Sequence, residues 1–162
     1  MKILIRGAEL TDLTRVIEIE RICFPEAEAA SEDSLEKRIR IFKGSFYVAV
    51  VEGEIVGFIN GGVTNERVIH DEMFSNPELH NPEGEYQSIF GLDVVPQYQH
   101  QGIAAKLMEH MITMARNSGR KGLILTCKEH LLDYYSRFGF GNMGLSESSH
   151  GGAVWFDMLL EF

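Results

Sequence analysis

The chain has 162 residues, of which 44% are hydrophobic and 24% are charged. This composition is typical of one soluble globular domain, spanning residues 1–162, with a single core. The formal net charge of −9 argues against a nucleic-acid partner, which requires a basic surface. No apolar run reaches the ~20 residues of a membrane span, and the first residues lack the pattern of a signal peptide. Two cysteines are too few for a disulfide framework, so we expect a cytoplasmic protein with free thiols and no membrane partner.

Periodicity, caps and turn residues predict the secondary structure. Thr11 or Asp12 is expected to cap the first helix, and Ser31 or Ser34 the second. The expected elements are a strand at 3–8, helices at 13–23 and 35–42, a hairpin at 45–62 that turns at 52–53, a long polar connection at 63–85, a strand at 86–95, a helix at 102–117, a strand at 123–127, a short helix at 131–138, and two final strands at 140–146 and 153–162.

The order of these elements, β-α-α-β-β-β-α-β-α-β-β, predicts an α/β (α+β) fold. Helices would flank a mixed and mostly antiparallel central sheet. The strand–helix–strand unit at 86–127 is expected to form a right-handed parallel crossover. Strands that diverge at this unit would open a cleft next to the turn that precedes the helix.

That turn, Gln99–Ala104, reads "QHQGIA" and joins a strand to a helix. A helix N-terminus presents backbone N–H groups without partners, which makes it a binding site for anions. A second interpretation is a helix start that merely needs flexible backbone at Gly102. The turn by itself does not distinguish the two.

Two motifs in the chain resemble those of the GCN5-related N-acetyltransferases, the GNAT family. The acetyl-CoA-binding pattern Gln/Arg-x-x-Gly-x-Gly/Ala of that family matches Gln99, Gly102 and Ala104. The family pattern Tyr-x-x-x-Gly-Phe matches Tyr135 and the Gly-Phe pair at 139–140. The expected element order also matches the family fold, so the resemblance covers essentially the whole chain.

Within the family, the segments 57–95 and 125–140 are similar to the arylalkylamine (serotonin) N-acetyltransferase-like branch. Cys127 precedes Tyr135 by eight residues, which is the spacing in that branch. The branch has two active-site histidines on the strand where this chain has Ser88 and Phe90. Its catalytic base therefore does not carry over.

The resemblance implies acetyl-CoA as cosubstrate, with its pyrophosphate at the amides of the turn and its pantetheine arm paired to the preceding strand. It also assigns the amide of Leu92 to the thioester oxygen, as an oxyanion donor. Gly91 would suit a bulge that orients this amide, or is simply a small residue in a crowded strand. No two histidines have metal-ligand spacing, so we expect no metal. The expected acetyl-CoA-binding residues are Leu92, Asp93, Val94, Gln99, His100, Gln101, Gly102, Ile103, Ala104 and Ala105.

Tyr135 is the expected general acid, because a phenol near the sulfur can protonate the departing thiolate. The alternative is a tyrosine that only packs in an aromatic pair. The base is open: Ser88 is a catalytic candidate that would hold a water and relay the proton outward. Glu85, His70 and His80 are candidates for the far end of that relay, or are plain surface residues.

We therefore expect an acetyl-CoA-dependent N-acetyltransferase that acts directly on a primary amine, either a small arylalkylamine or a polyamine. The acceptor is expected to meet Phe24, Pro25 and Glu85, below a rim that the acidic segments 24–33 and 63–85 border. Such a rim would attract a cation, although the solubility of exposed loops explains the acidic residues as well. A protein N-terminus or lysine is the alternative acceptor, and a CoA-binding module without turnover is the alternative class. The sequence leaves open whether the chain forms a homodimer.

Overall fold

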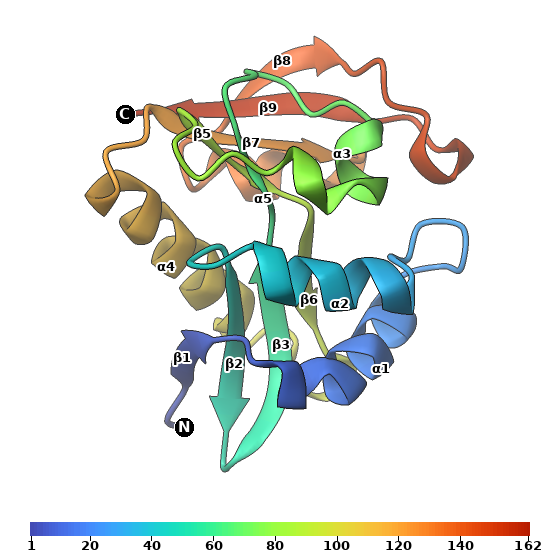
Figure 1. Cartoon of the computed structure of the whole chain (residues 1–162), viewed down its shortest axis with the longest axis vertical. Coiled ribbons are helices and arrows are strands. Elements are labelled where there is room, and N and C mark those ends of the chain that lie inside the picture. The colour runs from blue at the N-terminus through green and yellow to red at the C-terminus, as the bar shows by residue number, and fades with distance from the viewer.

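A sheet that splits into two parts organises the chain. The computed structural model describes residues 1–162, which form two sheets, and the segment 86–94 runs directly from one sheet into the other (Figure 1). The strands are β1 (Leu4–Gly7), β2 (Phe46–Val51), β3 (Glu54–Asn60), β4 (Val63–Thr64), β5 (Tyr86–Ile89), β6 (Gly91–Val94), β7 (Gly122–Cys127), β8 (Gly141–Leu145) and β9 (Phe156–Glu161). The α-helices are α1 (Leu13–Cys23), α2 (Glu32–Ile41), α3 (Glu72–Ser75), α4 (Ile103–Asn117) and α5 (Leu132–Ser136). Short 3-10 helices lie at Leu10–Asp12, Pro77–Leu79, Pro96–Tyr98, Glu129–Leu131 and His150–Gly152.

Strand pairing is antiparallel everywhere except between β5 and β7. The first sheet has the order β1-β2-β3-β6, and the second has the order β4-β5-β7-β9-β8. Helix α4 connects the parallel pair, as the sequence predicts for residues 86–127. The mixed, mostly antiparallel α/β fold is therefore confirmed.

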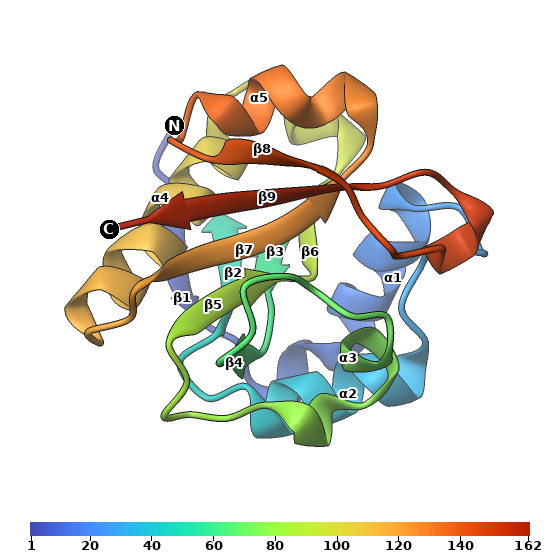
Figure 2. The same cartoon turned by 90° about the horizontal axis from the view of Figure 1, so that it is seen from above.

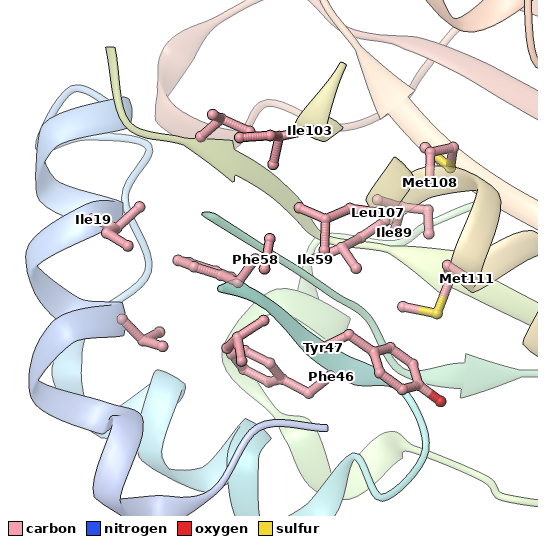
Figure 3. Packing of buried hydrophobic residues seen from close by; sticks show 14 of the residues in the cluster. Ile19, Phe46, Tyr47, Phe58, Ile59, Ile89, Ile103, Leu107, Met108 and Met111 are labelled. Carbon is pink, nitrogen blue, oxygen red and sulfur yellow. The ribbon is translucent and has the colours of Figure 1, made fainter. Parts of the chain in front are cut away.

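The apolar stripes of three helices hold them against the first sheet. Helices α1 and α2 cover one face of this sheet and α4 covers the other (Figures 1 and 3). Ile19 of α1 lies against Phe58 of β3 on one side, while Leu107 and Met111 of α4 lie on the other. All four side chains are fully buried, and each such burial contributes about 1.5–3 kcal/mol. In the second sheet, α3 and α5 lie on opposite sides of the β7–β9 pair (Figure 2).

The strand predicted at 86–95 is two strands, and this is the main correction to the expected fold. Residues 86–89 pair with β7 in the second sheet, whereas residues 91–94 pair with β3 in the first. Phe90 lies between them and donates its N–H to the carbonyl of Asn60 at 2.7 Å. Beyond the Ile89–Leu125 pair the chain leaves β7, so β6 and β7 diverge.

Of the two predicted helix caps, the one on α2 is confirmed and the one on α1 is wrong. Ser31 caps α2, because its hydroxyl accepts a hydrogen bond from the N–H of Ser34 at 3.1 Å. Neither Thr11 nor Asp12 caps α1 by its side chain. The carboxylate of Asp12 accepts instead from the N–H of Glu9 at 2.8 Å, one turn earlier, because a 3-10 helix precedes α1. No helix of the chain is long and apolar enough to span a bilayer.

The substitution Gly61→Ala tests the tight backbone contact between Gly61 and Ser88. This contact lies next to the point where the two sheets separate, which we call the split. A Cβ on Gly61 would lie 1.9 Å from the carbonyl oxygen of Ser88. Two backbone segments would have to separate to accept it, so Gly61→Ala should lower the free energy of unfolding by about 1–3 kcal/mol or more. Gly7→Ala is the control, since nothing lies within 4 Å of its Cβ position. Equal urea midpoints for the two variants would show that the split does not need this contact.

Candidate active site

Two cavities flank the place where β6 and β7 diverge. We call the first the α4 groove; its volume is about 480 Å³. We call the second the loop pocket; its volume is about 360 Å³. The α4 groove is lined by Leu92, Val94, Tyr98, Gln99, His100, Gly102, Ile103, Ala104, Ala105, Leu131, Tyr134, Tyr135 and Arg137. The loop pocket is lined by Glu20, Phe24, Glu28, Ala29, Ala30, Ser31, Ser34, Arg38, Asp71, Phe74, Ser75, Phe90, Thr126, His150 and Trp155.

The α4 groove ends on the open N-terminus of α4. Gly102 is the residue before the helix and has a φ of 85°, with no side chain to cap the first turn. The first helical hydrogen bond runs from the N–H of Lys106 to the carbonyl of Gly102 at 3.0 Å. The N–H groups of Ile103, Ala104 and Ala105 therefore lack partners within the helix. Together with the helix dipole they favour an anion in the groove.

The space in front of this turn is empty enough for a large anion. Nothing lies within 4 Å of the position that a Cβ on Gly102 would occupy. Arg137, which the sequence analysis did not single out, also lines the groove and adds a positive charge. The donors, the free volume and the charge all fit the pyrophosphate of CoA.

Eight of the ten residues expected to bind acetyl-CoA line this one groove, and Tyr135 lines it too. Gln101 and Asp93 are the exceptions. Gln101 is exposed and its side-chain amide donates to the carbonyl of Gln97 at 3.1 Å. Gln99 lines the groove, but its side-chain amide donates to the carbonyl of Val94 at 2.9 Å. That bond fixes the turn against the end of β6.

The backbone of β6 presents alternate residues to the groove. Val95 donates its N–H to the carbonyl of Val56 in β3 at 2.9 Å, so Asp93 also directs its backbone groups toward β3. Leu92 and Val94 direct theirs the other way, toward the groove that they line. Asp93, which the sequence analysis includes among the acetyl-CoA-binding residues, therefore has its backbone groups turned away from the groove. An extended ligand has the N–H groups of Leu92 and Val94 available, whereas the carbonyl of Val94 already accepts from Gln99 and Cys23.

Tyr135 places a hydroxyl in the groove without a partner in the chain. The hydroxyls of Tyr47 and Tyr86 donate to Gly44 and Glu161, whereas that of Tyr135 makes no such bond. Burial is the largest cause that raises the pKa of Tyr135 above its usual value. The phenol therefore keeps its proton at neutral pH, which a general acid requires.

The loop pocket is roofed by three connections that hydrogen bonds hold together. Asp71, from the connection before β5, accepts from the N–H of Ser149 at 3.1 Å. His150 makes a 2.9 Å hydrogen bond from its Nε2 to the carbonyl of Glu28 in the α1–α2 connection. Trp155 donates its indole N–H to the carbonyl of His150 at 2.8 Å. Because residues 146–155 fold across the pocket in this way, β9 begins at Phe156 and not at 153.

Among the expected acceptor residues, Phe24 lines the loop pocket. Pro25 lies in the adjoining turn, where its carbonyl accepts from the N–H groups of Glu28 and Ala29. Glu85 does not reach the pocket. It pairs with Lys121, at the end of β5 away from the split.

Ser88 is likewise not brought together with Tyr135. Its buried hydroxyl donates to the carbonyl of Gly62, and it lines a separate void of about 20 Å³. His80 lines the same void, and its Nδ1 accepts from the N–H of Val63 at 2.9 Å. His70 lies beside Glu66. Of the two acidic segments, Glu28 and Asp71 reach the loop pocket.

Sequence reasoning missed Glu20 and Arg38, which are buried and yet line the loop pocket. A carboxylate in the inward stripe of α1 was the available signal for Glu20. No three His, Cys, Asp or Glu side chains lie close enough to hold a metal ion.

Comparisons with known proteins agree with this geometry. Residues 13–140 match the model of the Acetyltransferase (GNAT) family. A probable hydrolase, YhcX of Bacillus subtilis (strain 168), is 26% identical over 136 residues, covering 76% of this chain and 26% of YhcX. An N-alpha-acetyltransferase of Sulfurisphaera tokodaii is 28% identical over 105 residues, covering 65% of this chain and 58% of that protein. The chain thus spans about a quarter of the first relative and little more than half of the second.

Solved structures share the fold over the whole chain. The loading GNATL domain of CurA from Lyngbya majuscula superposes with a TM-score of 0.83 at 16% identity, covering 99% of this chain and 98% of that one. Ard1 from Thermoplasma volcanium does so with a TM-score of 0.77 at 18% identity and the same coverage. The family match extends over most of the residues and the fold agrees from end to end, so the chain belongs to the GNAT family of acetyltransferases.

Proposed function

We propose that the chain transfers the acetyl group of acetyl-CoA directly to a small primary amine, with an arylalkylamine as the favoured acceptor class. One observation carries this proposal. The α4 groove and the loop pocket approach the same segment of strand, with Phe90 lining the pocket and Leu92 lining the groove. A donor in the groove and an acceptor in the pocket would therefore meet at the split between β6 and β7.

Different residues of the α4 groove bind different parts of acetyl-CoA. This cosubstrate supplies the activated thioester. The amides of Ile103, Ala104 and Ala105 bind the pyrophosphate at the start of α4. The outward N–H of Val94 donates to the pantetheine arm, which lies along β6 as a neighbouring strand would. The N–H of Leu92 stabilises the negative charge that develops on the thioester oxygen.

Tyr135 supplies the proton that the departing thiolate needs. Its hydroxyl has no competing partner in the chain, and its raised pKa keeps it protonated. The neighbouring Tyr134 packs edge-to-face at 5.2 Å, which restricts the ring of Tyr135. This arrangement favours the role of general acid over that of a packing residue.

The roof of the loop pocket favours a small acceptor over a peptide. A hydrogen bond from the N–H of Ser149 to Asp71 and one from His150 to the carbonyl of Glu28 tie together the connections around the pocket, whereas an extended peptide would need an open groove. The aromatic side chains of Phe24, Phe74, Phe90 and Trp155 line it and suit an aromatic amine. N-terminal acetylation is the second candidate, since one relative is an N-alpha-acetyltransferase.

Gly102→Glu tests the anion site. A carboxylate at this turn would repel the pyrophosphate, so CoA binding should weaken about a hundredfold or more. Gly119→Glu is the matched control: Gly119 lies just beyond the other end of α4, has a φ of 75° and also has nothing within 4 Å of its Cβ position. Calorimetric titration with CoA measures both. Equal affinities would place the pyrophosphate elsewhere.

Tyr135→Phe tests the general acid. This variant should lower kcat by ~10²-fold or more, while the affinity for CoA stays within about threefold. Tyr134→Phe keeps the same packing and should change kcat far less. Release of free CoA from acetyl-CoA in the presence of an amine gives the rates. If the two variants turn over equally fast, Tyr135 is not the acid.

A panel of acceptors tests the pocket. A cationic arylalkylamine should show a kcat/KM about tenfold or more above that of the same amine carrying a carboxylate, because Glu28 and Asp71 line the pocket. High salt should reduce this difference in kcat/KM, because it screens the charges of the pocket carboxylates. A peptide with a free N-terminus should react more slowly than either. Faster turnover of the peptide would establish the second candidate function instead.

A further inference from the structure

Four buried polar side chains meet beneath the loop pocket, and each comes from a different element. They are Glu20 on α1, Arg38 on α2, Asn60 on β3 and Asp93 on β6, and none is more than 5% exposed. A Cβ on Gly91 would lie 3.2 Å from Oδ1 of Asp93 and 3.9 Å from Oε1 of Glu20. The two carboxyl groups therefore approach each other beside Gly91.

Hydrogen bonds within the chain leave Asp93 without a donor. Arg38 directs its Nη1 to the side-chain oxygen of Asn60 at 3.3 Å and its Nη2 to the carbonyl of Phe74 at 2.9 Å. Both carboxyl oxygens of Asp93 are fully buried and have no partner among the other groups of the chain. A bare carboxylate in this position would pay for its desolvation without compensation.

A proton shared between Glu20 and Asp93 resolves this conflict. Burial is the largest cause that raises the pKa of Asp93 well above its usual value, and the negative charge of the nearby Glu20 raises that pKa further. The guanidinium of Arg38 acts in the opposite direction. Asp93 is then a neutral acid that donates to Glu20, while the charge of Glu20 is balanced by Arg38.

This Glu20–Asp93 pair extends from the wall of the loop pocket to β6. Glu20 lines the loop pocket, and its Oε2 also accepts from the N–H of Ala30 at 2.8 Å in the pocket wall. Asp93 is the residue next to Leu92, whose N–H faces the α4 groove. An amine in the loop pocket that gives its proton to Glu20 would thus become neutral next to the N–H of Leu92, the proposed oxyanion donor.

We propose that Glu20, with Asp93 as its hydrogen-bond donor, receives the proton that the acceptor ammonium must lose before it attacks the thioester. This inference rests on the proposed acetyltransferase function. The N–H bond breaks and its electron pair stays on nitrogen, while an O–H bond forms on Glu20. The nitrogen then forms the C–N bond as the C–S bond breaks and Tyr135 gives its proton to sulfur. A second proton from nitrogen restores Tyr135, and the proton on Glu20 passes to water as the amide leaves.

Three titratable groups near the pair, Cys23, Tyr135 and Arg38, do not compete for this proton. Cys23 donates its thiol to the carbonyl of Val94 at 3.4 Å, and burial raises the pKa of that thiol to about 12. Tyr135 also stays protonated because burial raises its pKa. Burial lowers the pKa of Arg38 to about 10, so this side chain is still a cation at neutral pH.

The first experiment compares Glu20→Gln with Glu18→Gln, the same change at an exposed position of the same helix. Near neutral pH, Glu20→Gln should lower kcat about a hundredfold, while the affinity for CoA stays within about threefold. Its rate should rise tenfold per pH unit toward the pKa of the amine, because solvent then supplies the neutral form. An amine of low basicity, already neutral at neutral pH, should restore the rate to within about tenfold of the wild type.

The outcomes separate this inference from the proposed function. If the wild type acetylates amines and Glu20→Gln matches its kcat and pH profile, Glu20 is not the proton acceptor and the proposed function stands. If Glu20→Gln is slow but neither high pH nor a weakly basic amine restores it, its role is structural and the inference is also wrong. If the wild type binds CoA but acetylates no amine, the proposed function fails.

The second experiment tests the shared proton without turnover. An Asp93→Asn side chain presents an N–H where neutral Asp93 presents an O–H, so the variant should fold. Because the pKa of Asp93 is raised in the folded chain, the wild type loses stability as pH rises above the ordinary carboxyl pKa of about 4. The urea midpoint of Asp93→Asn should therefore rise relative to the wild type between about pH 5 and about pH 8. A constant or falling difference would show that Asp93 is ionised and would overturn the shared proton.

Discussion

The whole site depends on one interruption in backbone hydrogen bonding, at Phe90. Residues before it pair with β7 and residues after it pair with β3, so the outward backbone groups of β6 face no other strand. Buried backbone groups without partners are costly, and an extended ligand is the natural means to pair them. The interruption also separates β6 from β7 and so creates both cavities at once.

Side chains around the interruption stabilise it through hydrogen bonds, and these side chains are therefore not free to take part in catalysis. Gln87 is buried, and its side-chain amide donates to the carbonyls of Gly61 at 2.9 Å and Ser88 at 2.8 Å. Ser45 donates to the side-chain oxygen of Gln87 at 2.8 Å, and the hydroxyl of Ser88 donates to Gly62. These bonds replace the ladder that the strand loses where it changes sheets. Ser88, a catalytic candidate from the sequence, thus satisfies backbone groups at the junction.

The sequence predicted the residues of the α4 groove better than those of the loop pocket, because the groove follows from local patterns and the pocket depends on contacts between distant segments. The turn around Gly102 and the position of Tyr135 follow from local patterns, namely a helix start and a fixed spacing to a Gly-Phe pair. The division of 86–95 into two strands depends on partners far away in the chain, so ten residues of continuous β-type sequence could not show it. The placement of Glu85 failed for the same reason, since the parallel register with β7 sends it to the opposite end of the strand. Glu20 was visible as an acid in an apolar stripe, but its meaning needed Asp93, which is 73 residues away.

The two cavities also differ in how far amino-acid substitutions can change the groups that would contact a ligand. In the groove, the hydrogen-bond donors proposed to bind the cofactor belong to the backbone: the amides at the start of α4 and the outward N–H groups of β6. Such groups persist under most substitutions, which agrees with a shared fold at 16–18% identity. The pocket is built from side chains on three connections and from the buried carboxyl pair on α1 and β6. In the proposed mechanism, a base on α1 in place of one on the strand costs the fold little, because one proton and the charge of Arg38 compensate the carboxyl groups of Glu20 and Asp93. Under the proposed function, the groups that bind the cofactor thus lie in the backbone, while the choice of acceptor and the route of the proton depend on a few side chains.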